Sequence, residues 1–304
     1  GVIATTAAQT YNDAVTLGVD TTLNGVNVTL ASTVNGAKNL TVNDSGTTTF
    51  GGIVGGTTAL TSITTNAPGT TAINGTAITT TGAQTYNDAV TLAADDVLTG
   101  VNVTFANTVN GAKNLTVNDS GTTTFSAVVG GTTALTSVTT DAAGATQLNG
   151  GVIATTAAQT YNDAVTLGVD TTLNGVNVTL ASTVNGAKNL TVNDSGTTTF
   201  GGIVGGTTAL TSITTNAPGT TAINGTAITT TAAQTYNDAV TLGADTTLSG
   251  VNVTLGSTVN GAKNLTVNDS GTTTFGGIVG GTTALTSITT NAPGTTAING
   301  TAIT

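Results

Sequence analysis

The sequence predicts an all-β protein, a right-handed parallel β-helix (a β-solenoid), and three observations carry this prediction. The stretch AKNLTVNDSGTTTF at residues 37–50 returns unchanged at 112–125, 187–200 and 262–275, always at the same interval. Short Thr-, Val- and Ile-rich segments alternate apolar and polar residues, which is the pattern of β-strands. Gly and Asn, which tolerate tight turns, separate these segments. Self-similarity at a fixed period of this kind indicates a solenoid, a propeller or an array.

A finer period inside the 75-residue repeat sets the expected coil. The segment LTVNDSGTTTF (40–50) aligns with ITTNAPGTTAI (63–73) at an offset of 23, and VTL at 15–17 precedes LTV at 40–42 at an offset of 25. We therefore expect about 25 residues per coil, three coils per repeat and roughly twelve coils in all. Each coil should hold three short strands with Gly/Asn corners, wound right-handed because parallel crossover connections are almost always right-handed.

The repeats define the expected domain organisation. They cover approximately 8–82, 83–157, 158–232 and 233–304, and we expect one solenoid over 1–304 that is an interior segment of a longer array. Residues 1–81 are identical to residues 151–231, whereas the second copy diverges most. The side chains expected to face the core are Val15, Leu17, Leu23, Val28, Leu40, Val42, Phe50, Ile53 and Ile78.

The composition excludes several functions. Only 6% of the residues are charged, and the net charge is −10 because fourteen acidic residues face four lysines. The lysines lie one per repeat, at Lys38, Lys113, Lys188 and Lys263. Phosphate recognition needs clustered cations, so we expect no nucleic-acid partner. No apolar run approaches the ~20 residues of a membrane helix, so no membrane insertion is expected.

Catalytic residue types are scarce. His and Cys are absent, and the sequence also contains no Glu and no Arg. A Ser–Lys pair is conceivable at Ser45 and Lys38, beside Asp44, but Asn43-Asp44-Ser45-Gly46 is better explained as a turn whose side chains bond local backbone. Adjacent side chains on a strand point to opposite sides of the sheet, so Asp95-Asp96 makes a poor two-carboxylate site. We expect no enzyme, no catalytic residue and no cofactor.

Metal and ice binding are weighed in the same way. Calcium accepts Asp and Asn oxygens, but Asp13, Asp20 and Asp44 lie in different parts of the expected coil, and turn capping explains them. We therefore expect no metal site. A regular threonine array could match ice, and the 25-residue coil places Thr16, Thr41, Thr64, Thr91 and Thr116 in one outward file. The files expected beside it contain Ala, Gly, Asn and Ser rather than Thr, which disfavours that reading.

The phrases NLTV…GTTTF and TAITTTGAQTYNDAVTL, the Gly/Asn corners and the absence of Cys resemble the β-helical shafts of large bacterial surface and secreted proteins. The filamentous-haemagglutinin type of exoprotein and related giant repeat adhesins are examples. The resemblance covers the whole chain in repeat style, and no functional residue is carried over with it. It implies an extracellular or cell-surface location and a role in a shaft or biofilm matrix.

Two functions therefore compete. The first is a structural repeat protein that forms the shaft of an extracellular or cell-surface filament. The second is an adhesin that binds glycan or another cell surface through outward Thr and Asn files. A β-helical polysaccharide lyase or hydrolase is a distant third, because its clustered carboxylates and base are missing. The expected partner is the protein itself, by end-to-end or lateral association or by continuation of the same chain.

Overall fold

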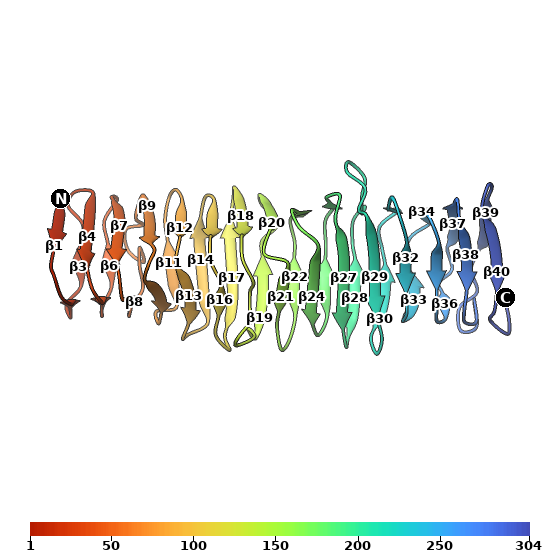
Figure 1. The fold of residues 1–304 in the computed structure, drawn as a ribbon, viewed down its shortest axis with the longest axis horizontal. Coiled ribbons are helices and arrows are strands. Elements are labelled where there is room, and N and C mark those ends of the chain that lie inside the picture. The colour runs from red at the N-terminus through yellow and green to blue at the C-terminus, as the bar shows by residue number, and fades with distance from the viewer. The chain divides into compact units, whose positions relative to one another are not determined.

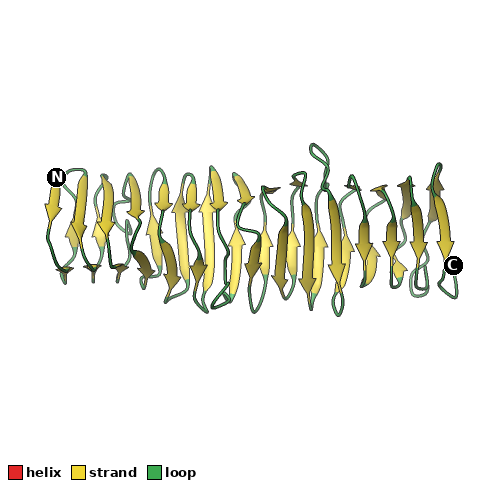
Figure 2. Cartoon of the chain, in the orientation of Figure 1, coloured by secondary structure: helices red, strands yellow, loops and turns green.

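The protein is all-β, as the sequence predicts. The computed structural model describes residues 1–304 and contains forty strands and no helix (Figure 2). The chain divides into two units, Gly1–Thr156 and Ala157–Thr304. In each unit parallel strands stack on one another in successive turns, with about 15 turns in the two units together. The expected fold class, a parallel β-solenoid, is confirmed.

Three sheets form the first unit, and each turn of the chain contributes one strand or one isolated bridge to each sheet (Figure 1). Sheet 1 contains β1 (Val2–Ala4), β4 (Thr21–Gly25), β7 (Asn39–Asp44), β9 (Ser62–Asn66), β12 (Gln84–Tyr86), β15 (Val103–Phe105), β18 (Thr122–Phe125) and β20 (Ala145–Leu148). Sheet 2 contains β2 (Gln9–Tyr11), β5 (Val28–Leu30), β8 (Thr47–Phe50), β10 (Thr70–Ile73), β13 (Ala89–Leu92), β16 (Val109–Asn110), a bridge at Val129 and β21 (Val152–Ala154). Sheet 3 contains β3 (Val15–Thr16), β6 (Val34–Asn35), a bridge at Val54, β11 (Ala77–Thr79), β14 (Asp96–Gly100), β17 (Asn114–Asp119) and β19 (Ser137–Thr140).

The second unit is built in the same way. Sheet 4 contains β22 (Gln159–Tyr161), β25 (Val178–Leu180), β28 (Thr197–Phe200), β30 (Thr220–Ile223), β33 (Ala239–Leu242) and β36 (Val259–Asn260). Sheet 5 contains β23 (Ala164–Leu167), β26 (Val184–Asn185), a bridge at Val204, β31 (Ala227–Thr229), β34 (Thr246–Gly250), β37 (Asn264–Asp269) and β39 (Ser287–Asn291). Sheet 6 contains β24 (Thr171–Gly175), β27 (Asn189–Asp194), β29 (Ser212–Asn216), β32 (Gln234–Tyr236), β35 (Val253–Leu255), β38 (Thr272–Phe275) and β40 (Thr295–Ile298).

The turn is shorter than the coil that the sequence predicts. Stacked residues are 19 apart at Thr21↔Leu40, 23 apart at Asn39↔Ser62 and 24 apart at Val54↔Ile78. The alignment of 40–50 with 63–73 was right, but Val15 pairs with Val34 rather than with Leu40. The extra turn was missed because β6 is so short and lies among Ser, Asn and Gly, which are typical of a corner.

The repeat does not match a whole number of turns. Each of the first three repeats contains eleven strand positions, namely ten strands and the bridge at Val54 or its copy, and three positions make a turn. A repeat therefore advances by three and two-thirds turns, not by three. Consequently β7 lies in sheet 1, while its identical copy β17 lies in sheet 3. In the second unit, likewise, β27 lies in sheet 6 while its identical copy β37 lies in sheet 5.

The core consists of the inward side chains of all three sheets. Leu17, Leu23, Val28, Leu40, Val42, Phe50 and Ile78 are buried as expected. Val15 is half-buried. Ile53 was predicted wrongly: it is 38% exposed, and Val54 is fully buried instead. Val54 forms the bridges to Val34 and Ile78, which fixes the alternation, and the Ile53 side chain lies against Gly56 on the outside.

The second repeat carries an aromatic stack inside this core. Tyr86, Phe105 and Phe125 are successive residues of one inward file, and neighbouring ring centroids are 5.3 Å apart. The ring planes lie within 13° and 3° of parallel. Leu30, Leu180 and Leu255 stand in the other repeats where the second repeat has Phe105. Offset stacking of this kind adds to the area term of burial.

The corrected alternation gives a first prediction. Phe200→Asp should lower the free energy of unfolding by at least about 3 kcal/mol, because an unpaired carboxylate replaces a buried ring. Phe200 is fully buried, whereas Ile203 is 39% exposed. Ile203→Asp is therefore the matched control and should cost no more than about 0.5 kcal/mol. Urea unfolding measures the loss of stability in each variant. Equal losses would contradict the assignment in which Val204 faces the core and Ile203 faces outward.

Candidate interaction surface

A file of threonines runs along the outside of sheet 1. Its members pair in register through six successive strands: Thr22, Thr41, Thr64, Thr85, Thr104 and Thr124. All six are half-buried, as outward residues of a sheet are. Val2 precedes this file and Gln147 follows it. Sheet 6 carries the corresponding file in the second unit: Thr172, Thr191, Thr214, Thr235, Thr254 and Thr274.

The file expected from the sequence was wrong in its membership. Thr41 and Thr64 do pair, but Thr16 lies on β3 in sheet 3, Thr91 on β13 in sheet 2 and Thr116 on β17 in sheet 3. A 25-residue step crosses from one sheet to another, because the real steps are shorter and unequal. The true file uses Thr22, Thr85 and Thr104, which the longer step passes over.

An asparagine ladder lies beside the threonine file. Asn43 donates its amide to Asn24 Oδ1 at 2.7 Å, Asn66 donates to Asn43 Oδ1 at 2.6 Å, and Asn87 donates to Asn66 Oδ1 at 2.8 Å. The two inner members, Asn43 and Asn66, thus each accept one hydrogen bond from the next turn and donate one to the previous turn. Sequence reasoning paired Asn43 with Asn66 but missed Asn24 and Asn87, whose recurrence at offsets of 19 and 21 was the available signal.

A third outward file stands on the other side of the threonines. Asn39 donates its amide to Asp20 Oδ2 at 2.9 Å, and Ser62 donates its hydroxyl to Asn39 Oδ1 at 2.7 Å. The Asn39 backbone N–H also donates to Asp20 Oδ1, at 3.0 Å. These bonds from the backbone and side chain of Asn39 hold the pKa of the exposed Asp20 carboxyl below its usual value. The exposed face of sheet 1 is therefore a polar surface of three parallel files.

The turn at Asn43–Gly46 is structural, as the sequence analysis favoured. Asp44 is buried, and its Oδ1 accepts the backbone N–H groups of Asn27 and Gly46, both at 2.7 Å. Its Oδ2 accepts the N–H of Val28 at 2.6 Å and the hydroxyl of Thr48 at 3.3 Å. Asn27 and Val28 belong to the preceding turn, so this carboxylate ties two turns together at a corner. Asn27 adopts a positive φ of 59° there.

The other catalytic candidates do not form a site with it. Ser45 is exposed, and its backbone N–H donates to the carbonyl of Gly25. Lys38 is half-exposed, and its positive charge helps to lower the pKa of Asp20 in the preceding turn. Asp95 is exposed and Asp96 is buried, so the two carboxylates point to opposite sides of β14 as expected. No three His, Cys, Asp or Glu side chains lie close enough together to hold a metal ion.

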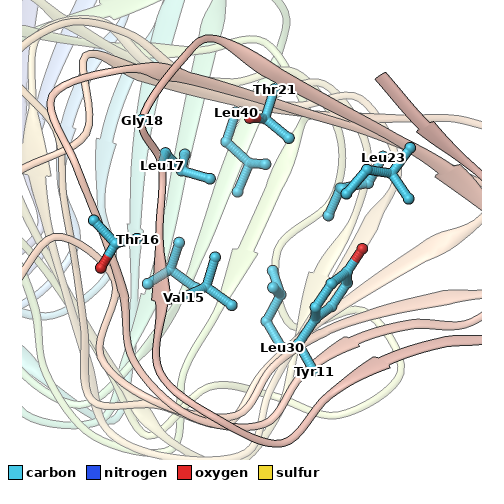
Figure 3. A pocket seen from close by; sticks show the side chains of 11 residues that line it. Tyr11, Val15, Thr16, Leu17, Gly18, Thr21, Leu23, Leu30 and Leu40 are labelled. Carbon is cyan, nitrogen blue, oxygen red and sulfur yellow. The ribbon is translucent and has the colours of Figure 1, made fainter. Parts of the chain in front are cut away.

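One apolar pocket opens at the first turns of the first unit. Its volume is about 170 Å³, and the inward side chains of Tyr11, Val15, Leu17 and Leu23 line it (Figure 3). These residues are core by position: Tyr86, the copy of Tyr11 in the second repeat, is fully buried. Ile3, also in the lining, is 45% exposed, whereas its copy Ile153 pairs with Val129 and is 2% exposed. The pocket is therefore lined by residues whose copies in the second and third repeats belong to the core.

Comparison of the chain with known proteins and structures finds no match. No protein-family model matches the chain, and neither a curated protein nor a solved structure shows significant similarity to it. The structure contains no helix of the length and hydropathy that crossing a lipid bilayer requires. The solenoid, its repeats and its polar outer files are therefore the observations from which function is inferred.

The corner carboxylates give a second prediction. Asp269 repeats the arrangement of Asp44, with the N–H groups of Asn252, Val253 and Gly271 at 2.8, 2.9 and 2.7 Å. Asp269→Asn should destabilise the fold by about 1–3 kcal/mol, because an amide group replaces one acceptor oxygen. The control Asp245→Asn changes an exposed carboxyl and should cost clearly less, because water can replace the lost acceptor. Chemical unfolding at pH 7 compares the two, and equal costs would contradict the role of the corner.

The pKa of Asp269 determines how acid changes the stability of the fold. Burial raises the pKa of Asp269, but the three backbone N–H groups and the Thr273 hydroxyl hold it below its usual value. A lowered folded pKa gives stabilisation that is complete above the unfolded value of about 3.9 and is lost as the pH falls through the folded pKa. The difference in stability between the native chain and Asp269→Asn should therefore shrink below about pH 4.

Proposed function

We propose that this protein is a structural repeat protein that forms the shaft of an extracellular or cell-surface filament. The support is a parallel ladder of backbone hydrogen bonds through each unit, combined with a file of buried apolar side chains beneath it. In a solenoid each turn contacts only its neighbours, so turns of the same sequence can be added without a new design. The extracellular location is supported by the resemblance in repeat style.

The observation that carries this proposal is the advance of three and two-thirds turns per repeat. Within the first unit the phrase 39–50 lies on sheets 1 and 2, and its identical copy 114–125 lies on sheets 3 and 1. A surface that binds one flat target needs its binding residues on one side. Here identical residues face different sides in successive repeats, as suits a stiff spacer whose sides are equivalent.

One specific observation favours the second candidate function, an adhesin. Six threonines and four asparagines form adjacent files on sheet 1, and hydroxyl and amide groups at regular spacing are suited to hydrogen bonding with glycan. Because the file is assembled from two different repeats, it depends on stacking and not on any single repeat. This adhesin function predicts that aligned threonines act together.

We propose self-association as the partner interaction. Inside the first unit a turn is packed between two further turns of the repeat array: Val129, for example, pairs with Val109 on one side and with Ile153 on the other. The turn that contains Val129 covers Ile153 and leaves it 2% exposed. Unpaired strand edges are templates for further strands. A turn of the same repeat, from the same polypeptide or from another copy, is the occupant that matches.

Replacement of threonines separates the two candidates and gives a third prediction. One variant changes four aligned residues of sheet 1 to Val: Thr41, Thr64, Thr85 and Thr104. The matched control changes Thr41, Thr116, Thr191 and Thr266, which hold the same position in each repeat but do not stack on one another in successive turns. For a shaft, both sets should leave attachment to cells or glycan unchanged and shift stability by about 0.5 kcal/mol or less per site. Loss of attachment in the aligned set alone would establish the adhesin.

Electron microscopy tests the shaft itself and gives a fourth prediction. Antibodies against the repeat should label thin fibres on the surface of the source cells, and label confined to the cell interior would refute the proposal. Purified chains of four, eight and twelve repeats should lengthen by about 18 Å per repeat, since three and two-thirds turns at ~4.8 Å separate equivalent residues. Three turns per repeat would give about 14 Å, so the measurement also checks the corrected turn count.

A further inference from the structure

One buried carboxyl group in the second repeat lacks the partners that every corner carboxylate has. Asp96 opens β14, is 1% exposed, and neither of its carboxyl oxygens has a hydrogen-bond partner. An unpaired ionised carboxylate is among the most costly groups to bury. The corner acids lie against N–H and hydroxyl donors, so Asp96 stands apart from them.

The other repeats show what this position accommodates. Thr21, Thr171 and Thr246 occupy it, and each donates its hydroxyl to the carbonyl two residues earlier, at 2.9, 2.9 and 3.0 Å. The position therefore offers a backbone carbonyl as acceptor, and a side chain that fits it must donate a hydrogen bond. A carboxylate cannot donate, whereas a protonated carboxylic acid has one O–H to give. The environment fits Asp96 in its neutral form.

The charged and titratable groups on the same turn offer Asp96 no cation. Asp95 lies beside it on the chain, exposed, and accepts the N–H of Asn114 at 2.9 Å. The Tyr86 hydroxyl already donates to Gln84 at 2.9 Å. Asp88 accepts the hydroxyls of two threonines of the preceding turn, Thr65 and Thr71.

The neighbouring strand β17 adds no partner either. It contributes Asp119, whose carboxylate accepts the backbone N–H groups of Asn102 and Val103. Lys113 precedes this strand, and its positive charge helps to lower the pKa of Asp95. The groups around Asp96 therefore reinforce its preference for the neutral form.

Burial, and then the charge of Asp95, raise the pKa of Asp96 to about 7. A folded pKa above the unfolded value of about 3.9 means that the folded turn holds a proton which the opened turn releases. The contribution of Asp96 to the stability of this turn is therefore greatest at low pH and falls as the pH rises from about 4 towards 7. Above about pH 7 both states are ionised and the loss is complete.

We propose that Asp96 makes residues 84–100 a pH-sensitive turn of the solenoid, closely packed when its carboxyl group is protonated and loosened when that group ionises. The geometry behind this is the burial of Asp96, its two unpartnered oxygens and the donor that its position requires. The device belongs to the second repeat alone, because the other three carry Thr. It does not depend on the shaft function, and it would let one point of the molecule open at neutral pH while its copies stay closed.

Native-state hydrogen exchange on the 304-residue chain tests this proposal. After correction for the intrinsic exchange rate, the opening constant of amides in 84–100 should rise about tenfold per pH unit between about pH 5 and 6.5 and level off above about pH 7. Residues 159–175 of the third repeat, which contain Thr171, are the internal control and should show no such slope. Equal pH dependence in both segments would overturn the proposal.

Three variants make the test independent of packing. Asp96→Asn keeps the shape of the side chain and removes the ionisation, and Asp96→Thr restores the residue of the other repeats; both should flatten the slope in 84–100. Thr171→Asp should transfer the slope to 159–175. A slope that persists in both Asp96 variants, or a Thr171→Asp chain whose third repeat is equally protected at pH 5 and 7.5, would contradict the role of Asp96.

The carboxyl group can also be observed directly. The ¹³C chemical shift of the Asp96 side chain, followed by NMR from pH 3 to 9, should titrate with a midpoint near the pKa of about 7. Asp95, one residue away, is the reference, since its bonds to the backbone and side chain of Asn114 lower its pKa below the usual value. A midpoint below about 5 for Asp96 would show that it is ionised in the packed turn and would refute the proposal.

Discussion

The stacking of each strand on the strand one turn later is the constraint on which the rest of this structure depends. Parallel pairing requires equivalent backbone positions to meet at each step, even though the steps differ in length along the chain. Because side chains alternate along a strand, a single register decides which residues form the core and which form the outer files. Leu40 and Val42 are buried while Thr41 faces out for this reason, and the asparagine ladder repeats because its backbone does.

The corners set a second requirement, which polar side chains meet from inside. A corner leaves backbone N–H groups without strand partners, and buried N–H groups must find an acceptor. Asp44 supplies two oxygens to three N–H groups of two successive turns, so the acid holds the corner together. Asp96 shows the converse, since it is a buried acid without donors. The same chemistry thus stabilises one site and makes another sensitive to pH.

The mismatch between the 75-residue repeat and the turn governs what the surface can do. Duplication of the repeat preserves the core, because every sheet accepts the same apolar alternation. It does not preserve a face, because β7 and its copy β17 lie in different sheets. Threonine files nevertheless form where strands of different sequence carry Thr at equivalent positions, as Thr64 and Thr85 do. This combination favours a spacer with equivalent sides over a one-sided binding surface.

The sequence by itself determined the class of fold, the corners and most of the core. Alternation, Gly/Asn corners and the repeat are local patterns, so Phe50, Leu40 and Val28 were assigned correctly from the sequence alone. The length of a turn, the members of each outer file and the exposure of Ile53 were decided only by the tertiary structure. The physical reason is that stacking joins residues of unlike sequence: the short strand β6 counts as a full step although nothing local marks it as a strand. The unpaired burial of Asp96 is likewise a property of the packed turn, since its neighbours in space and not its neighbours in sequence leave it without a donor.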